Sequence, residues 1–224
     1  MRARAAAAAR LAGLGLLALA TLPFVIHALT RGASGMAGDP GACGRLCWPD
    51  LPAVSQSIFL HMVLGGVITV LVLVQLVGPI RRRWPAVHRC TGRAVVLLGL
   101  GTAAGGLVYM VAVGTVGGPV MTAGFTLYGL LMAGAAIQTY RFARVRDVAS
   151  HRRWGLRLVV LALASWLYRV HYSLWFMLTG GAGTAPDFSG PFDQIQVFAF
   201  YLPYLALLEL HLRRRHGPPM MRSA

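Results

Sequence analysis

The stretch that decides the fold class runs from Ser57 to Arg83, SIFLHMVLGGVITVLVLVQLVGPIRRR, where a nearly unbroken apolar run ends on three consecutive arginines. A run of about 20 apolar residues can cross a hydrocarbon core of roughly 30 Å as an α-helix. Lys and Arg accumulate on the cytoplasmic side of such helices. The segment therefore predicts a transmembrane helix whose C-terminal end faces the cytoplasm.

The composition of the whole chain agrees with this interpretation. Of its 224 residues, 57% are hydrophobic and only 12% are charged, and the formal net charge is +15. A soluble domain is about one quarter charged and at most about half apolar. The apolar content excludes a disordered chain. The basic residues are separated by long uncharged runs, which excludes the continuous basic face of a nucleic-acid binder. The composition thus predicts an integral membrane protein whose surroundings are the lipid bilayer.

Six segments are long and apolar enough to span a membrane. Strands of alternating polarity are absent from the sequence, which leaves helices rather than a barrel. We therefore expect an all-α bundle that forms one domain over residues 1–224, with an outer loop at 30–56 and a basic tail at 213–224. The six expected helices cover residues 11–29, 57–80, 93–113, 120–140, 155–178 and 192–212.

The arginines orient this bundle. If the six helices alternate in direction, 18 arginines fall on one side of the membrane and two, Arg31 and Arg45, on the other. The positive-inside rule then places both termini in the cytoplasm and predicts a multi-pass protein of the cell membrane. The first segment also resembles a signal peptide, with Ala18-Leu19-Ala20 as its cleavage site. We favour an uncleaved membrane anchor.

Small residues and cysteines give two local predictions. Gly99 and Gly106 are seven residues apart and should lie where the 93–113 helix packs closely against a neighbour. Cys43 and Cys47 lie in the expected outer loop, an oxidising location where a disulfide is favoured over two free thiols.

One pattern, H-R-x-x-G, occurs twice. It begins at His88 and again at His151, each time at the expected cytoplasmic start of a helix. Two imidazoles at equal depth could bind one group between them, such as haem iron, a lipid phosphate or a quinone head. The alternative is structural, because Arg suits the inner helix end, Gly allows close packing and His suits the headgroup layer.

A second polar cluster is expected in the outer half of the bilayer, from His61, Arg169 and His171. An Arg at that depth costs about 2.5 kcal/mol or more if it is unpaired, so an internal partner is expected. Asp193, at the start of the last helix, is the protein candidate, and a bound anion would serve equally well.

These motifs together carry a family resemblance. Over residues 55–178 the chain resembles a bacterial family of predicted multi-helix membrane proteins of unassigned function. The resemblance rests on the run from His61 to Gln75, the arginines that follow it, and the two His-Arg blocks. The arrangement is more distantly similar to the two-haem b-type transmembrane cytochromes, which bind haem through two His pairs near opposite membrane faces. That resemblance implies haem b, with His61 and His88 matching the first two ligand positions.

The chain departs from the cytochrome pattern in its remaining ligands. The expected helix at 120–140 contains no His, and both remaining candidates, His151 and His171, lie on the next helix. Twenty residues of helix span roughly 30 Å, so these two cannot share one haem. The possible pairs are His88 with His151 on the inner side and His61 with His171 on the outer side.

Three functions remain open on this basis. The first is a redox protein that binds haem or a quinone through the His pairs and exchanges electrons with a partner. The second is a small-solute transporter in which Arg169, His61 and His171 form the intramembrane site. The third is a non-catalytic scaffold or partner protein, in which the polar residues only fix helix pairing. Enzymatic activity and oligomeric state are left open.

Overall fold

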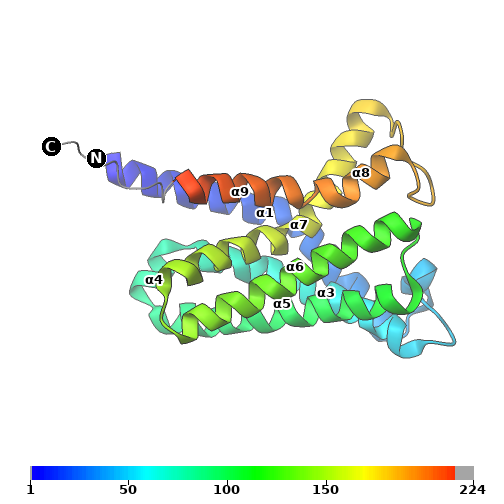
Figure 1. Cartoon of the computed structure of the whole chain (residues 1–224), viewed down its shortest axis with the longest axis horizontal. Coiled ribbons are helices and arrows are strands. Elements are labelled where there is room, and N and C mark those ends of the chain that lie inside the picture. The colour runs from blue at the N-terminus through cyan, green and yellow to red at the C-terminus, as the bar shows by residue number, and fades with distance from the viewer. Residues whose placement is uncertain (1, 215–224) are drawn as a thin grey trace.

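The computed structural model describes residues 2–214, so most of the predicted basic tail at 213–224 lies outside the described residues. Every regular element in the described range is helical, and no strand occurs there (Figure 1). In chain order the elements are α1 (Arg2–Met36), α2 (Pro40–Cys43), η1 (Gly44–Leu46), α3 (Pro52–Leu76), α4 (Gly78–Arg83), α5 (Pro85–Val113), α6 (Gly118–Arg144), α7 (Val148–Thr179), α8 (Pro191–Ala199) and α9 (Leu202–Arg214).

Five candidate membrane spans meet the requirements of length and apolar composition among the described residues, where the sequence predicted six. They are α1 from Ala5, α3, α5, α6 and the stretch Pro191–Arg214 that comprises α8 and α9. Although α7 is 32 residues long, it is not among them. Its polar side chains, including Arg169 and His171, reduce its apolar character.

The helix predicted at 57–80 is broken near its end. Val77 is extended, with φ −73° and ψ 100°, and separates α3 from the short α4. Pro79 explains the break, because proline has no backbone N–H and its ring clashes with the carbonyl four residues earlier. The next helix begins at Pro85 rather than at 93. His88 therefore lies within the first turn of α5.

The segment predicted as one helix over 192–212 is also divided. It consists of α8 and α9, which are separated at Phe200 and Tyr201. Pro203 lies in the first turn of α9, a position where its missing N–H costs nothing. The expected loop at 30–56 is partly helical as well, because α1 continues to Met36 and α3 already begins at Pro52.

The core lies between α3, α5, α6 and α7. A Cβ atom added to Gly99 of α5 would lie 3.5–3.6 Å from side chains of Ile68, Leu158 and Ala136, which belong to the other three helices. The predicted close packing at Gly99 is therefore confirmed. Outside this core, α1 packs along α3, with Phe24 buried between α1 and its neighbours.

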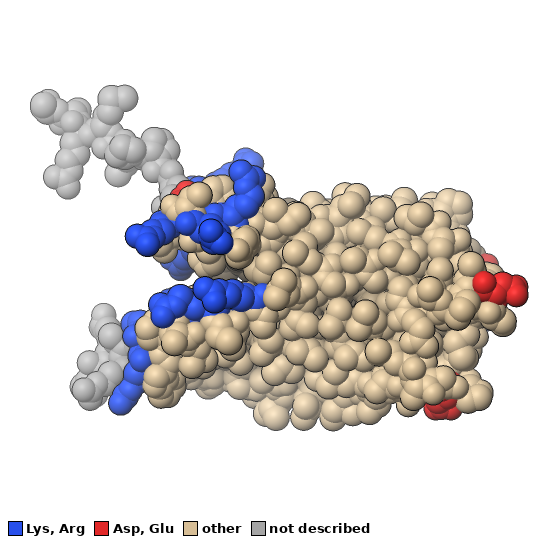
Figure 2. Space-filling view, turned by 90° about the horizontal axis from the view of Figure 1, so that it is seen from below, with Lys and Arg blue, Asp and Glu red and all other residues tan. Residues whose placement is uncertain are grey.

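Charge separates the two ends of the molecule. The start of α1, the short α4 and the end of α9 lie at the same end (Figure 1). Figure 2 shows arginines gathered at this end, whereas the opposite end displays acidic side chains. We call the first the basic end, where α4 with Arg81–Arg83 lies, and the second the acidic end, where the connections that contain Asp39 and Asp187 lie (Figure 1).

Candidate functional site

The structure separates the predicted site residues into two groups. His88 and His151 lie near the basic end, in the first turns of α5 and α7. His61 and Arg169 line one cavity deeper in the bundle. His171 belongs to neither group, because it faces α8 and α9.

His151 is held in a defined orientation. Asp147 caps the start of α7 by accepting a hydrogen bond from the backbone N–H of Ser150, at 3.0 Å. One turn of helix then places the His151 ring beside the end of α6, where Nδ1 donates to the carbonyl oxygen of Thr139 at 2.9 Å. A carbonyl oxygen only accepts, so the neutral ring carries its proton on Nδ1 and presents a lone pair on Nε2.

The Asp147 carboxylate lies outside the membrane-spanning segments. The hydrogen bonds from Ser150 hold the pKa of this carboxyl below its ordinary value of 3.8. The cap therefore stays ionised at neutral pH, and negative charge at a helix start is favourable.

His88 lies within electrostatic range of His151, with Arg81 and Arg89 nearby. Its ring is half-buried and makes no hydrogen bond to any described residue. Gln75 fixes the backbone at this point, because its amide donates to the carbonyl oxygen of His88 at 3.3 Å and to the hydroxyl of Thr91. The inner pair predicted from the sequence thus consists of the imidazoles of His88 and His151. Hydrogen bonds to backbone carbonyl oxygens hold both residues in place.

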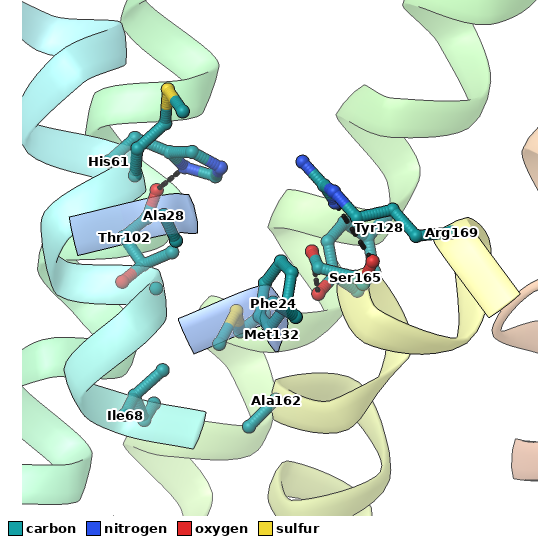
Figure 3. Close-up of a pocket in the computed structure, with 12 residues that line it drawn as sticks. Phe24, Ala28, His61, Ile68, Thr102, Tyr128, Met132, Ala162, Ser165 and Arg169 are labelled. Carbon is teal, nitrogen blue, oxygen red and sulfur yellow. Dashed lines mark hydrogen bonds between the residues drawn. The ribbon is translucent and has the colours of Figure 1, made fainter. Parts of the chain in front are cut away.

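The second group surrounds a cavity of about 60 Å³ (Figure 3). Nδ1 of His61 donates to the carbonyl oxygen of Thr102 at 2.7 Å, which leaves Nε2 with a lone pair. Figure 3 shows the ring directed across the cavity toward Arg169. Gly105 and Gly106 of α5 make room for this ring, since a Cβ at Gly106 would lie 3.0 Å from Nδ1 of His61.

Arg169 contacts backbone and aromatic groups but no acid. Its Nη1 donates to the carbonyl oxygen of Ser165 at 2.9 Å, and its guanidinium carbon lies 4.8 Å from the ring centre of Phe24. Among residues 2–214, no carboxylate lies within 4.0 Å of this guanidinium. The expected pairing with Asp193 is therefore absent.

Asp193 has other partners. It is 1% exposed, and its carboxylate accepts hydrogen bonds from the Tyr172 hydroxyl at 2.6 Å and from the backbone N–H groups of Ala185 and Gly190 at 2.9 and 3.1 Å. These contacts tie the turn before α8 to α7, so the role of Asp193 here is structural.

His171 does not approach His61. Its Nε2 lies 2.7 Å from the hydroxyl of Tyr204, and its Nδ1 contacts the side-chain amide of Gln196. Both ring nitrogens are therefore engaged. Pockets for small organic ligands span roughly 300–1,000 Å³, whereas the cavity at His61 has about 60 Å³. A haem between His61 and His171 does not fit this structure.

Several residues of the cavity were not found by sequence reasoning. The hydroxyl of Tyr128 donates to the carbonyl oxygen of Leu161 at 2.6 Å and lies 3.3 Å from the hydroxyl of Ser165. Thr102 is 5% exposed, and its Oγ1 has no hydrogen-bond partner among the described residues. Tyr128 lies on α6, which contains no histidine.

At the acidic end, Cys43 and Cys47 form a disulfide that closes the turn between α2 and α3, with 5.0 Å between their Cα atoms. Tyr109 of α5 contacts the same region, because its hydroxyl accepts a hydrogen bond from the indole N–H of Trp48 at 3.3 Å.

The helices, their five candidate spans and the polar groups between them define a helical membrane protein. The chain belongs to the family described as predicted membrane protein DUF2306, whose model matches residues 58–212. This agrees with the resemblance found over residues 55–178. No curated protein and no solved structure matches the chain significantly. The family match supports a bilayer environment and does not extend to haem or quinone.

Proposed function

We propose that this protein crosses the cell membrane six times, with both termini in the cytoplasm, and binds one b-type haem between His88 and His151. In this proposal it is an electron-transfer protein with a single haem near its cytoplasmic face, rather than a two-haem protein. The observation that carries the proposal is the hydrogen bond from Nδ1 of His151 to the carbonyl oxygen of Thr139.

The polarity of the molecule supports the topology. Arginines gather at the end where α1 begins and α9 ends, which matches the cytoplasmic side of the positive-inside rule (Figure 2). Counting α7 as the sixth span makes the helices alternate, and its 32 residues are ample for the roughly 20 that a span requires.

The chemistry of the two imidazoles supports a metal centre over a quinone head. Histidines that bind a metal commonly donate their other ring N–H to a carbonyl or carboxylate, which fixes the tautomer and ring orientation. His151 has this arrangement. The carbonyl oxygens of a quinone would need a hydrogen-bond donor, which Nε2 of neutral His151 is not.

Nearby residues suit the remaining parts of a haem. His88 and His151 would hold the iron through their Nε2 atoms, and Arg81 and Arg89, whose charges act on His88, would be available to the carboxylates of a haem. A haem bound in this way would supply one-electron transfer. Gln75 would keep the first turn of α5, and with it His88, in place.

Absorption spectra of the purified, full-length protein test this proposal. We expect a reduced b-type spectrum from wild type, and loss of haem from His88→Ala and from His151→Ala. His211→Ala is the matched control, because His211 is exposed in the last turn of α9 at the same end. His61→Ala should also retain haem. A protein that stays colourless after reconstitution with haem, or equal haem content in all four variants, would contradict the proposal.

A further inference from the structure

The cavity between His61 and Arg169 contains unbalanced polar groups that the proposed haem site does not use. An Arg guanidinium remains charged in proteins, and an unpaired one within a bilayer is costly. No carboxylate of the described residues balances Arg169. Arg169 is exposed, so its guanidinium is accessible to an anion from outside the chain.

A second polar group independently indicates a ligand. Thr102 is 5% exposed, lines the cavity, and its Oγ1 has no partner within residues 2–214. A buried polar group without a hydrogen bond costs about 1–3 kcal/mol, which is more than the net stabilisation that a typical hydrogen bond contributes. Its carbonyl oxygen is already used by His61, so the free group is the hydroxyl itself.

The size and the access of the cavity limit the ligand. A volume of about 60 Å³ accommodates about two water molecules or one small ion, since one water occupies roughly 30 Å³ in the liquid. Arg169 also lines an open groove of about 690 Å³ at the acidic end, together with Tyr168 and Tyr172. Arg169 thus lines both the groove and the cavity, and a solute from the acidic end would meet its guanidinium on the way to His61.

From these observations we infer that the cavity is a binding site for one small monovalent oxyanion, of the size of bicarbonate or nitrate, that enters from the acidic end. Arg169 supplies charge-assisted hydrogen bonds and Thr102 supplies a hydroxyl donor. Nε2 of neutral His61 accepts a hydrogen bond, so an oxyanion that carries its own O–H should bind more tightly than one without. The site is separate from the proposed haem site.

The test is anion binding by the purified full-length protein at pH 8, with sodium bicarbonate and sodium nitrate as probes. A ligand that binds the folded state raises the melting temperature, and the rise grows with the logarithm of ligand concentration once that concentration exceeds Kd. We expect both anions to do so, bicarbonate at lower concentration. Arg169→Gln should weaken binding about 10-fold or more, and Thr102→Val about 3- to 10-fold.

Two comparisons separate binding from misfolding. Without anion, Thr102→Val should melt no lower than wild type, because it removes a hydroxyl that bonds nothing in the described chain. Arg45→Gln is the control for charge, since Arg45 is exposed near the acidic end and outside the cavity. The inference is overturned if neither anion raises the melting temperature of wild type, or if Arg169→Gln and Arg45→Gln respond alike. Loss of haem from His88→Ala has no bearing on this result.

Discussion

At the residue scale, helix periodicity decides which side chains meet. Residues one turn apart share a face, so Ser165 and Arg169 of α7 line the same cavity. Arg169 and His171 are two residues apart, about 200° around a helix, and cannot both face it. Our sequence interpretation grouped them by depth in the bilayer alone. Depth and angle together separate His171 from Arg169.

The glycine facing His61 gives a prediction at this scale. Gly106→Ala should destabilise the protein by about 1–3 kcal/mol, because the added Cβ would lie 3.0 Å from Nδ1 of His61 and overpack the ring. Thermal unfolding in detergent measures the effect. Gly134→Ala of α6 is the control, because a Cβ atom at this position would meet nothing within 4 Å. The substitution also replaces a glycine inside a helix by a better helix former. It should stabilise by up to about 1 kcal/mol. Equal effects at both positions would mean that His61 is not packed against Gly106.

At the element scale, apolar runs predicted where helices lie better than where they end. The apolar run from Ser57 to Ile80 predicted α3 correctly, but it did not predict the break at Val77 that Pro79 causes. Composition also predicted that α7 is more apolar than it is. Part of this helix carries polar side chains that contact α8 and α9. Such contacts depend on tertiary structure and leave little periodic signal.

The ion pair between α7 and α9 gives a second prediction. Arg157 donates from Nε and Nη2 to the two carboxylate oxygens of Glu209, at 2.6 and 2.9 Å. A double-mutant cycle with Arg157→Gln and Glu209→Gln should give a coupling free energy of unfolding of about 1–3 kcal/mol, because the pair is bidentate and partly shielded. A coupling near zero would show that this ion pair does not help to hold α9 to α7.

The helix cap at Asp147 gives a pH-dependent prediction. Asp147→Ala should lower the melting temperature at pH 7, whereas Asp147→Asn should lower it less, because an amide oxygen can still accept from Ser150. The pKa of Asp147 is lowered in the fold, so its contribution is complete above the ordinary value of 3.8 and is lost as pH falls through the lowered pKa. The gap between wild type and Asp147→Ala should therefore close in acid. A gap that stays constant with pH would contradict the ionised cap.

At the scale of the whole molecule, the sequence predicted an all-α membrane protein because composition and charge act over the entire chain. The candidate site was predicted only in part. His88 and His151 stood out because a motif repeats, but Thr139 and Thr102 orient the rings of His151 and His61 through backbone carbonyls, which any residue provides. Tyr128 lies in an apolar helix with no motif to mark it.

The topology has its own prediction. Periplasm-active reporters should be active when fused after Gly38, Gly117 or Gly183, and cytoplasm-active reporters after Arg83 or Asp147. The basis is the gathering of arginines at one end of the molecule. Fusions after Asp147 and Gly183 matter most, because together they show whether α7 crosses the membrane. If both fusion points lie on the same side of the membrane, α7 does not cross it and the protein has five spans.

Haem content per chain tests the central claim most directly. The purified protein, saturated with haem and freed of excess, should contain one haem per chain by the pyridine haemochrome method. One is expected because the inner pair presents free Nε2 atoms, whereas the ring nitrogens of His171 are both engaged and the cavity at His61 has about 60 Å³. Two haems per chain would contradict the single site, and no bound haem would contradict the proposal that this membrane protein carries electrons.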